Sequence, residues 1–341
     1  MLNFFKKDQT ARRRLPNEVV GLDFGTTSTK AVRLRKSHEE VTLVAADILP
    51  AINLNANARP SLPLPPKLVT NYAAVALSSN QQVVRLVNVS GTSGAQDPTL
   101  GPKLQEMVKV ESHERLAYTV LLAVPAKRET LVLTVALPEA EIAGVLSMLA
   151  HGPPAALSVE NASLAALTAF YHGPGRTLTE ESVCFIDSGA QTTFVAFLRK
   201  GIPVLVRTLD LGGEHLVQRL QTQWGLDRET AMGTLGQSTT IDVSQPVHEL
   251  AGSFLRQLSI SRDFVERQEN CRITRAYLSG GMSLIRHWVQ EIHDATGMEA
   301  QTWDPFQNLI VPPNAMPPAM DGQTTRWAAA VGAALAVFEE A

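Results

Sequence analysis

Residues 19–30 read VVGLDFGTTSTK, and far downstream residues 183–193 repeat the pattern as VCFIDSGAQTT. Each segment is an apolar run, then Asp-x-Gly, then small hydroxylated residues that lead into another apolar run. This order predicts a strand, a tight turn and a returning strand. Gly25 and Gly189 let each turn adopt a positive φ and approach a ligand closely. Exposed N–H groups at such a tip form an anion-binding concavity, so both hairpins are expected to bind phosphate.

Each hairpin also contains an aspartate, which indicates that a metal ion accompanies the phosphate. A carboxylate beside an anion repels it unless a cation lies between them. Asp23 and Asp187 are therefore expected near a hydrated Mg²⁺ on the phosphates of a nucleotide. The alternative is that both are turn-forming residues that cap their own backbone. Because two such hairpins occur roughly one domain apart, the sequence predicts two lobes that clasp a nucleotide.

The composition indicates a globular protein with two domains. The 341 residues exceed one ordinary core, and 45% hydrophobic with 18% charged residues excludes a disordered chain. A net charge of -3 gives no general electrostatic reason to bind nucleic acid. Cys184 and Cys271 are the two cysteines, and both lie in apolar, strand-like contexts. They are expected to be buried thiols of a reducing compartment, with no disulfide framework or Cys/His metal site.

The segments outside the apolar runs carry little functional signal. No run of about 18 apolar residues occurs, so no transmembrane helix is expected. The N-terminal tail contains Lys6, Lys7 and three arginines at 12–14. It either touches anionic lipid weakly or is a solvated tail. The proline-rich stretch 59–66 cannot form a helix or a central strand and is expected to be a surface connection, with a polyproline ligand as the alternative.

The middle of the chain predicts an insertion. Residues 72–77 and 83–89 are expected to form a pair of strands. After the polar passage 91–101, the apolar spacing predicts a helix, two strands and a further helix that begins at Pro138. Residues 158–170 are rich in small side chains and are expected to form a closely packed helix.

These signals divide the chain into six expected parts. They are a basic tail (1–17), a first lobe with the phosphate hairpin (18–90), an inserted α+β subdomain (91–155), a connecting helix of the first lobe (156–180), a second lobe (181–325) and a closing helix (326–341).

This order of parts resembles the actin-like ATPase superfamily over nearly the whole chain. Within it the chain looks most like the PilM proteins of type IV pilus assembly, relatives of FtsA, which share the inserted subdomain. The Gly-Gly turn in YLSGGMSLI (277–285), followed by WDPFQNL (303–309), is similar to the PilM pattern. The resemblance implies an α/β, two-lobed actin-like ATPase fold of ribonuclease H-like halves, with the α+β subdomain inserted in the first lobe. The C-terminal membrane helix usual in FtsA is not expected.

Carried over residue by residue, the resemblance implies a site for ATP or ADP with Mg²⁺. Asp23 and Asp187 would hold the waters around the metal. The β- and γ-phosphates would be contacted by Gly25, Thr26, Thr27, Gly189, Thr192 and Thr193. The ribose would lie near Gly212, Gly213 and Glu214, and the adenine over Gly280, Gly281 and Met282.

Two further residues have competing interpretations. Lys30 matches a phosphate-binding lysine of actin, or it extends out of a strand into solvent. Glu160 falls where chaperone ATPases of the superfamily keep a water-orienting glutamate, or it is a carboxylate favoured at a helix N-terminus. Ala190 and Gln191 replace a second glycine of many relatives, and Asn161 replaces a proline. Because turnover needs a positioned water as well as a phosphate cradle, slow or absent hydrolysis is compatible with this sequence.

The resemblance implies a cytoplasmic, nucleotide-binding adaptor of a type IV pilus or related secretion platform. It would bind the short cytoplasmic N-terminus of a PilN-like inner-membrane protein and so lie at that membrane through its partner, as a monomer or with weak self-association. Other platform proteins are further expected partners. The alternatives are a kinase of a small metabolite and an FtsA-like, filament-forming division protein, because the same fold hosts all of these functions.

Overall fold

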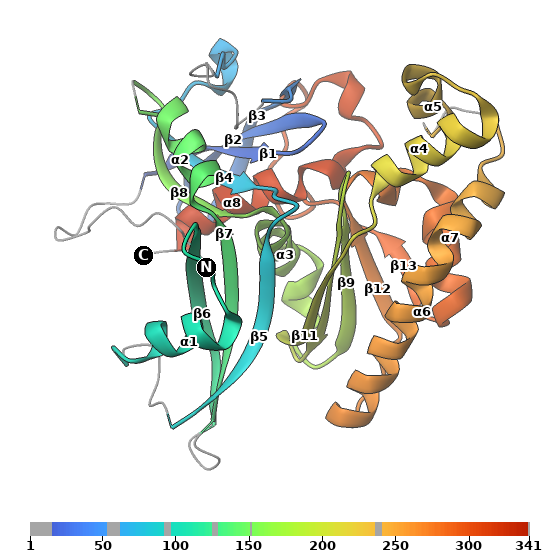
Figure 1. Ribbon diagram of the computed structural model, residues 1–341. Coiled ribbons are helices and arrows are strands. Elements are labelled where there is room, and N and C mark those ends of the chain that lie inside the picture. The colour runs from blue at the N-terminus through green and yellow to red at the C-terminus, as the bar shows by residue number, and fades with distance from the viewer. Residues whose placement is uncertain are drawn as a thin grey trace. The chain divides into compact units, whose positions relative to one another are not determined.

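Two five-stranded sheets with the same topology form the framework of the chain (Figure 1). The computed structural model describes residues 16–52, 62–91, 97–124, 129–150, 152–235 and 241–339. Most of the expected basic tail and residues 59–61 of the proline-rich stretch lie outside these ranges, as do residues 340 and 341 of the closing helix.

The strands are β1 (Glu18–Phe24), β2 (Ser28–Ser37), β3 (Glu40–Pro50), β4 (Tyr72–Leu77), β5 (Val83–Ser90), β6 (Glu114–Val124), β7 (Glu129–Pro138), β8 (Ala155–Asn161), β9 (Ser182–Ser188), β10 (Thr193–Arg199), β11 (Ile202–Leu209), β12 (Arg275–Ser279) and β13 (Glu299–Thr302). The helices are α1 (Leu100–Val108), α2 (Glu139–Met148), α3 (Ala162–His172), α4 (Gly213–Trp224), α5 (Arg228–Thr234), α6 (Ser244–Glu269), α7 (Arg286–Thr296) and α8 (Ala328–Glu339).

The chain forms two compact units, each built on one of these sheets. The first unit contains the described residues up to Gly173, together with 305–322 and the residues from Trp327 onward, and the second contains 174–304 and 323–326. Strand order is β3-β2-β1-β4-β8 in the first unit and β11-β10-β9-β12-β13 in the second. In both sheets an antiparallel meander of three strands is continued by two parallel strands. The expected two-lobed α/β architecture and both predicted hairpins are confirmed. The expected positive φ at Gly25 and Gly189 is wrong, since neither is among the positive-φ glycines of the described residues; both glycines are needed for space, because an added Cβ would crowd each turn.

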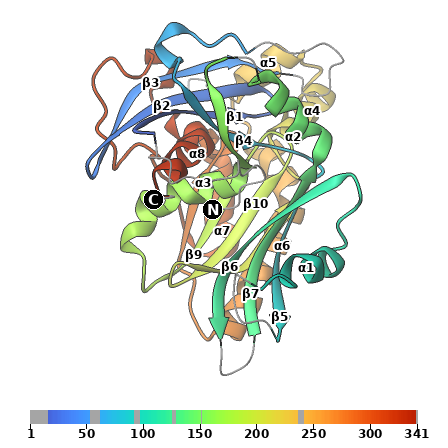
Figure 2. The same cartoon turned by 90° about the vertical axis from the view of Figure 1, so that its left-hand side faces the viewer.

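Helices α8 and α3 pack against the five-stranded sheet of the first unit. Helix α8 packs on β1, β2 and β4, and α3 packs on α8 (Figure 2). From Ala328 to Phe338 every residue of α8 is buried. The small side chains of α8 permit a close approach, because a Cβ added to Gly332 would lie 1.7 Å from the carbonyl oxygen of Ala165 in α3. Only glycine fits at this crossing.

The first unit also carries the inserted subdomain, a three-stranded sheet of order β5-β7-β6 with α1 and α2. Leu100 and Leu104 of α1 pack with Val89 of β5 and Val132 of β7. The expectation that residues 72–77 and 83–89 pair with each other is wrong: both strands exist, but β4 lies between β1 and β8, whereas β5 pairs with β7. Apolar alternation predicts a strand, but it does not say which neighbour completes its ladder.

The helix expected from residue 158 begins later. Residues 158–161 belong to β8, which pairs in parallel with β4, and α3 starts at Ala162. The side chain of Asn161 caps α3, because its Oδ1 accepts a hydrogen bond from Leu164 N at 3.1 Å. Asparagine is a favoured N-cap, so this residue ends the strand and starts the helix.

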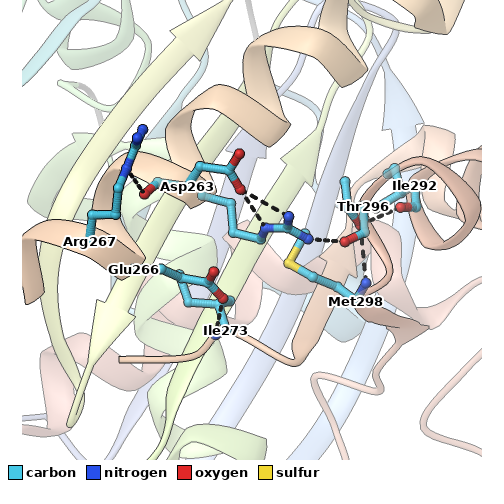
Figure 3. A network of polar contacts seen from close by, with 8 residues as sticks. Asp263, Glu266, Arg267, Ile273, Ile292, Thr296 and Met298 are labelled. Atoms are coloured by element: carbon cyan, nitrogen blue, oxygen red, sulfur yellow. Dashed lines mark hydrogen bonds and ion pairs between the residues drawn. The ribbon is translucent and has the colours of Figure 1, made fainter. Parts of the chain in front are cut away.

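In the second unit, α6 and α7 pack on each other, and the rings of Phe254 (α6) and Trp288 (α7) lie 4.9 Å apart between centroids. A polar network joins the same two helices (Figure 3). Arg262 of α6 donates to the carbonyl oxygen of Thr296 at the end of α7 and, through Nη2, to Asp263 Oδ1 at 2.9 Å. Glu266 Oε1 accepts from Ile273 N at 2.8 Å and so holds the chain that enters β12.

The two cysteines lie in the second unit. Cys184 is buried in β9, where burial raises the pKa of its thiol, and Cys271 is partly exposed. The expectation of a buried thiol is confirmed for Cys184 only. Among the described residues no helix combines the length and the apolar character that a membrane span requires.

The α3–α8 crossing generates a prediction. Replacing Gly332 by alanine should lower the free energy of unfolding by about 1–3 kcal/mol or more, because the added methyl group meets a backbone carbonyl that cannot move alone. Gly101→Ala in α1 is the matched control in the same unit. Its Cβ would lie 3.7 Å from Tyr118 Oη, an ordinary contact, so stability should stay equal or rise slightly. Urea unfolding followed by circular dichroism measures the stability of both variants. Equal unfolding midpoints for Gly332→Ala and Gly101→Ala would contradict the requirement for glycine at the α3–α8 crossing.

Candidate functional site

The first candidate hairpin is the turn between β1 and β2. Thr26 and Thr27 are exposed at its tip, and Gly25 N donates to Asp23 O at 3.0 Å. A Cβ on Gly25 would lie 2.9 Å from Lys30 Nζ and 3.0 Å from Ser28 O. The turn is therefore narrow, with a lysine ammonium group beside it.

Lys30 does not extend into solvent. Its Nζ lies 3.5 Å from Asp23 Oδ2, and the two side chains are only 12% and 8% exposed. The two residues are also direct cross-strand partners in the β1–β2 ladder. A nearly buried ammonium at the base of an open turn places positive charge where an anion would dock. This contact excludes the solvent-extended alternative, whereas phosphate binding by Lys30 stays a prediction.

The strand register brings Glu160 into line with this hairpin. Asp23 pairs with Ala76 of β4, and Ala76 pairs with Glu160 of β8. Residues opposite each other on adjacent strands point to the same face of the sheet, and two strand spacings put Asp23 and Glu160 about 10 Å apart. Glu160 is 1% exposed and lies in a strand, so the helix N-terminus interpretation is wrong.

In the second unit three connections meet around the second hairpin. A Cβ on Gly212, just before α4, would lie 2.5 Å from Ala190 C. A Cβ on Gly280, at the end of β12, would lie 2.3 Å from Ser188 O, and Gly280 has φ 82°. A Cβ on Gly213 would lie 3.5 Å from Met282 Cγ. The structure thus brings together, within this unit, the expected phosphate, ribose and adenine segments.

Ala190 replaces the second glycine, and its carbonyl group has a structural role. Glu214 N donates to Ala190 O at 2.7 Å, and Gly213 N donates to Gly189 O at 3.1 Å. The first backbone N–H groups of α4 are therefore used by the hairpin. The expected ribose segment supports the phosphate hairpin directly, so the two segments are expected to move as one body.

The hydroxyl and carboxylate groups of the second hairpin are also held by neighbours. Thr193 is fully buried, and its Oγ1 donates to Leu211 O at 2.7 Å. Asp187 Oδ1 accepts from Ser279 Oγ at 2.9 Å, and the two residues are partners in the parallel β9–β12 ladder. Thr192 and Gln191 are partly exposed at the tip. The roles of Asp187, Thr192 and Thr193 in a nucleotide site stay predictions.

Glu214 forms an ion pair. Arg228 of α5 donates from both terminal nitrogens to its carboxylate, with Nη2 at 2.7 Å from Oε2. The hydrogen bond from Arg228 holds the pKa of Glu214 below its ordinary value. The expected ribose contact of Glu214 would therefore have to share this carboxylate with an arginine.

In the expected adenine segment, Met282 is buried and Gly281 has open space at its Cβ position.

Two features of the hairpins are compatible with binding of phosphate and a hydrated cation. Ser28 Oγ and Ser188 Oγ are buried at the two hairpins and have no hydrogen-bond partner within the described ranges. Both hairpins also have a glycine where a side chain would crowd the turn, since a Cβ on Gly189 would lie 3.2 Å from Thr192 O. No group of three or more His, Cys, Asp or Glu side chains that could ligate a metal directly occurs in the described part of the chain. An Mg²⁺ held through water does not need such a group.

Sequence reasoning missed three contributors to these sites. Ser279 stands in the quoted Gly-Gly segment, yet its bond to Asp187 depends on the β9–β12 register. Arg228 lies 14 residues after Glu214, and this spacing does not predict an ion pair. Gln82 accepts from Asn161 Nδ2 at 2.5 Å, a contact across 79 residues. Strand register creates the first contact, the packing of α4 and α5 creates the second, and the path of the β4–β5 link creates the third.

Comparison with known proteins adds the family. A family model described as type IV pilus assembly protein PilM matches residues 155–338. Among solved structures, a PilM-PilN type IV pilus biogenesis complex matches with 19% identity and a TM-score of 0.75, over 95% of this chain and 100% of that chain. This similarity shows the fold.

Two other structures are less similar. The ethanolamine utilization protein EutJ from Carboxydothermus hydrogenoformans has 14% identity and a TM-score of 0.47, over 94% of this chain and 90% of that chain. A protein with actin-like ATPase fold from Bacteroides thetaiotaomicron has 8% identity and a TM-score of 0.46, over 91% and 96%. No curated protein matches the sequence.

The Glu214–Arg228 pair predicts a pH dependence. Because the pKa of Glu214 is lowered in the folded state, the pair stabilises the protein above the ordinary glutamate pKa of 4.5, and this contribution is lost as pH falls through the lowered value. Glu214→Gln should therefore be less stable than wild type at pH 7, and the difference should shrink as pH falls below 4.5. Glu229→Gln, a neighbouring acid of α5 for which the described residues hold no ion pair, is the control. Unfolding midpoints are measured across this pH range. A difference between wild type and Glu214→Gln that does not change with pH would contradict the predicted role of the ion pair.

Proposed function

The chain belongs to the PilM family of type IV pilus assembly proteins, and on that premise we propose that it is an adaptor in the inner-membrane platform of a type IV pilus machine. The family match over residues 155–338 carries this proposal. The fold alone would not, because the same architecture hosts kinases, chaperones and filaments. Family membership therefore favours the adaptor over the metabolite kinase and the division filament.

The proposed partner is the short cytoplasmic N-terminus of a PilN-like inner-membrane protein. Support comes from the similarity to a PilM-PilN type IV pilus biogenesis complex, of which the matched chain is covered completely. Through this partner the protein would lie at the inner membrane on the cytoplasmic side. We place the contact on the inserted subdomain, which exposes Met107 on α1 (48%) and Leu122 on β6 (43%). Large apolar side chains on a surface are the usual anchors of a docked peptide.

The second element of the proposal is a nucleotide, ATP or ADP with Mg²⁺. In the first unit Gly25, Thr26 and Thr27 would offer backbone and hydroxyl groups to phosphate oxygens, with Lys30 supplying positive charge. In the second unit Gly189 and Thr192 would do the same. Asp23 and Asp187 would each hold water of the hydrated Mg²⁺, which supplies charge neutralisation when bound. The narrow turns, the Lys30 ammonium group and the buried serine hydroxyls support this assignment.

The nucleoside side of the site would be built by the second unit alone. Gly212, Gly213 and Glu214 would lie near the ribose, and Gly280, Gly281 and Met282 near the adenine. Their convergence around one hairpin supports a shared ligand. Glu160, on the same sheet face as Asp23, would orient the attacking water if the nucleotide is turned over. Nucleotide binding by itself needs only the phosphate cradle.

Nucleotide binding is tested by removing its charge partners one at a time. Lys30→Met and Asp187→Asn should each weaken Mg-ATP binding about tenfold or more, because one loses the ammonium group and the other a ligand for the metal's water shell. Lys103→Met, which removes a charge from α1, should leave the affinity unchanged. Isothermal titration calorimetry measures all four proteins. Wild-type affinity in both site variants would remove the nucleotide from the proposal and leave a static adaptor.

Partner binding has its own test. A synthetic peptide with the N-terminal sequence of the PilN family protein from the same organism should bind the wild-type protein. Leu122→Asp should weaken it about tenfold or more, because an anion in an apolar contact loses both hydration and packing. Ile260→Asp is the control, since Ile260 is equally apolar and 64% exposed but lies on α6 of the second unit. An equal loss of peptide affinity in both variants, or no loss in Leu122→Asp, would contradict a contact at Leu122 of the inserted subdomain.

A further inference from the structure

Two side-chain contacts tie the inserted subdomain to the five-stranded sheet of the first unit. Gln82 Oε1 accepts from Asn161 Nδ2 at 2.5 Å, and Ser79 Oγ donates to Glu141 Oε1 at 3.2 Å. Ser79 and Gln82 lie on the link between β4 and β5, Glu141 lies in α2, and Asn161 ends β8. We call these four residues the root clasp.

Asn161 is the buried centre of the root clasp. It is 0% exposed, and both ends of its amide are used: Oδ1 caps α3 by accepting from Leu164 N, and Nδ2 donates to Gln82. The cap fixes which end of the amide points to α3, and so fixes the donor that faces Gln82. If Gln82 moved away, a fully buried donor would lose its acceptor, which a folded protein tolerates poorly.

Gln82 and Ser79 are both connected to the inserted subdomain, so a movement of the subdomain would displace them. Gln82 is the residue immediately before β5, the first strand of the three-stranded sheet. Ser79 Oγ also accepts from Gln81 N at 3.1 Å, so the link is braced internally as well as against α2. A shift of the three-stranded sheet would therefore pull on both contacts.

At its other end the root clasp adjoins the candidate nucleotide site. Asn161 directly follows Glu160 and pairs with Leu77 of β4, one position beyond the row that contains Asp23, Ala76 and Glu160. All of these residues belong to the first unit. The amide of Asn161 is thus one residue away from the carboxylate row and one hydrogen bond away from the start of the inserted sheet.

We propose that the Gln82–Asn161 contact couples the occupancy of the first phosphate hairpin to the conformation of the inserted subdomain. The inference rests on the proposed function, because it assigns the regulation of the same nucleotide and partner sites. A ligand that shifts the ends of β1, β4 and β8 displaces Asn161, and the buried amide keeps its acceptor only if Gln82 and β5 move with it. The contact is either made or broken, which is the discrete behaviour that coupling between sites requires.

Hydrogen–deuterium exchange of the full chain, with and without Mg-ATP, tests the coupling without the partner peptide. In the wild-type protein Mg-ATP should slow exchange at the hairpin of residues 24–28 and change exchange in β5 by about fivefold or more. Gln82→Met keeps the length of the side chain but removes the acceptor. It should retain the hairpin effect and lose the effect in β5.

Two further variants control the experiment. Gln82→Glu keeps an acceptor for Asn161 Nδ2 and should restore the response of β5. Gln81→Met changes the exposed neighbour and should behave as wild type. A β5 response that survives in Gln82→Met, or a wild-type protein whose hairpin responds while β5 does not, would overturn the coupling and leave the proposed function intact. If Mg-ATP changes exchange nowhere in the wild-type protein, the nucleotide part of the proposed function fails, and the coupling fails with it.

Discussion

The parallel ladders between β1 and β4 and between β9 and β12 are the constraint on which both candidate sites depend. In each, the aspartate of the hairpin stands beside a residue of the parallel neighbour, Ala76 in the first unit and Ser279 in the second. Because side chains alternate along a strand, a slip of one residue would turn Asp23 or Asp187 to the opposite face. The antiparallel ladders fix the same face, because they pair Asp23 with Lys30 and Asp187 with Phe194.

The two hairpins use the same backbone plan with different supports. The first has an ammonium group of its own, since Lys30 lies against Asp23 and beside the turn. The second is supported by backbone and hydroxyl contacts: Ala190 accepts from the start of α4, and Asp187 accepts from Ser279. The first hairpin therefore combines an exposed tip with a buried charge pair, whereas the second forms one body with its neighbouring turns. This difference is the physical reason to test the two hairpins by separate variants.

The inserted subdomain departs from the repeat of the two sheets, and its attachment includes two side-chain hydrogen bonds. Its own small core is apolar, formed by α1 on β5 and β7, but Ser79, Gln82 and Glu141 join it to the rest of the first unit. Hydrogen bonds are directional, so they specify one position more sharply than an apolar contact would. A directional attachment beside the carboxylate row is consistent with the proposed coupling between the first hairpin and the inserted subdomain.

The sequence by itself predicted the two hairpins and the closing helix, because each depends on local turn chemistry and apolar period. It also predicted an inserted block, but without β5, the first strand of its sheet. It also pointed to Asp23, Gly25, Asp187 and Gly189 through the matched frames of VVGLDFGTT and VCFIDSGAQ. Only the tertiary structure decided that β5 joins the inserted sheet, that Glu160 lies in a strand, that Arg228 holds Glu214, and that Asn161 reaches Gln82. The strand outcomes depend on which distant strands become neighbours and in what register, and local sequence does not encode this. The Glu214–Arg228 pair depends on how α4 and α5 pack, and the Asn161–Gln82 contact depends on the path of the β4–β5 link.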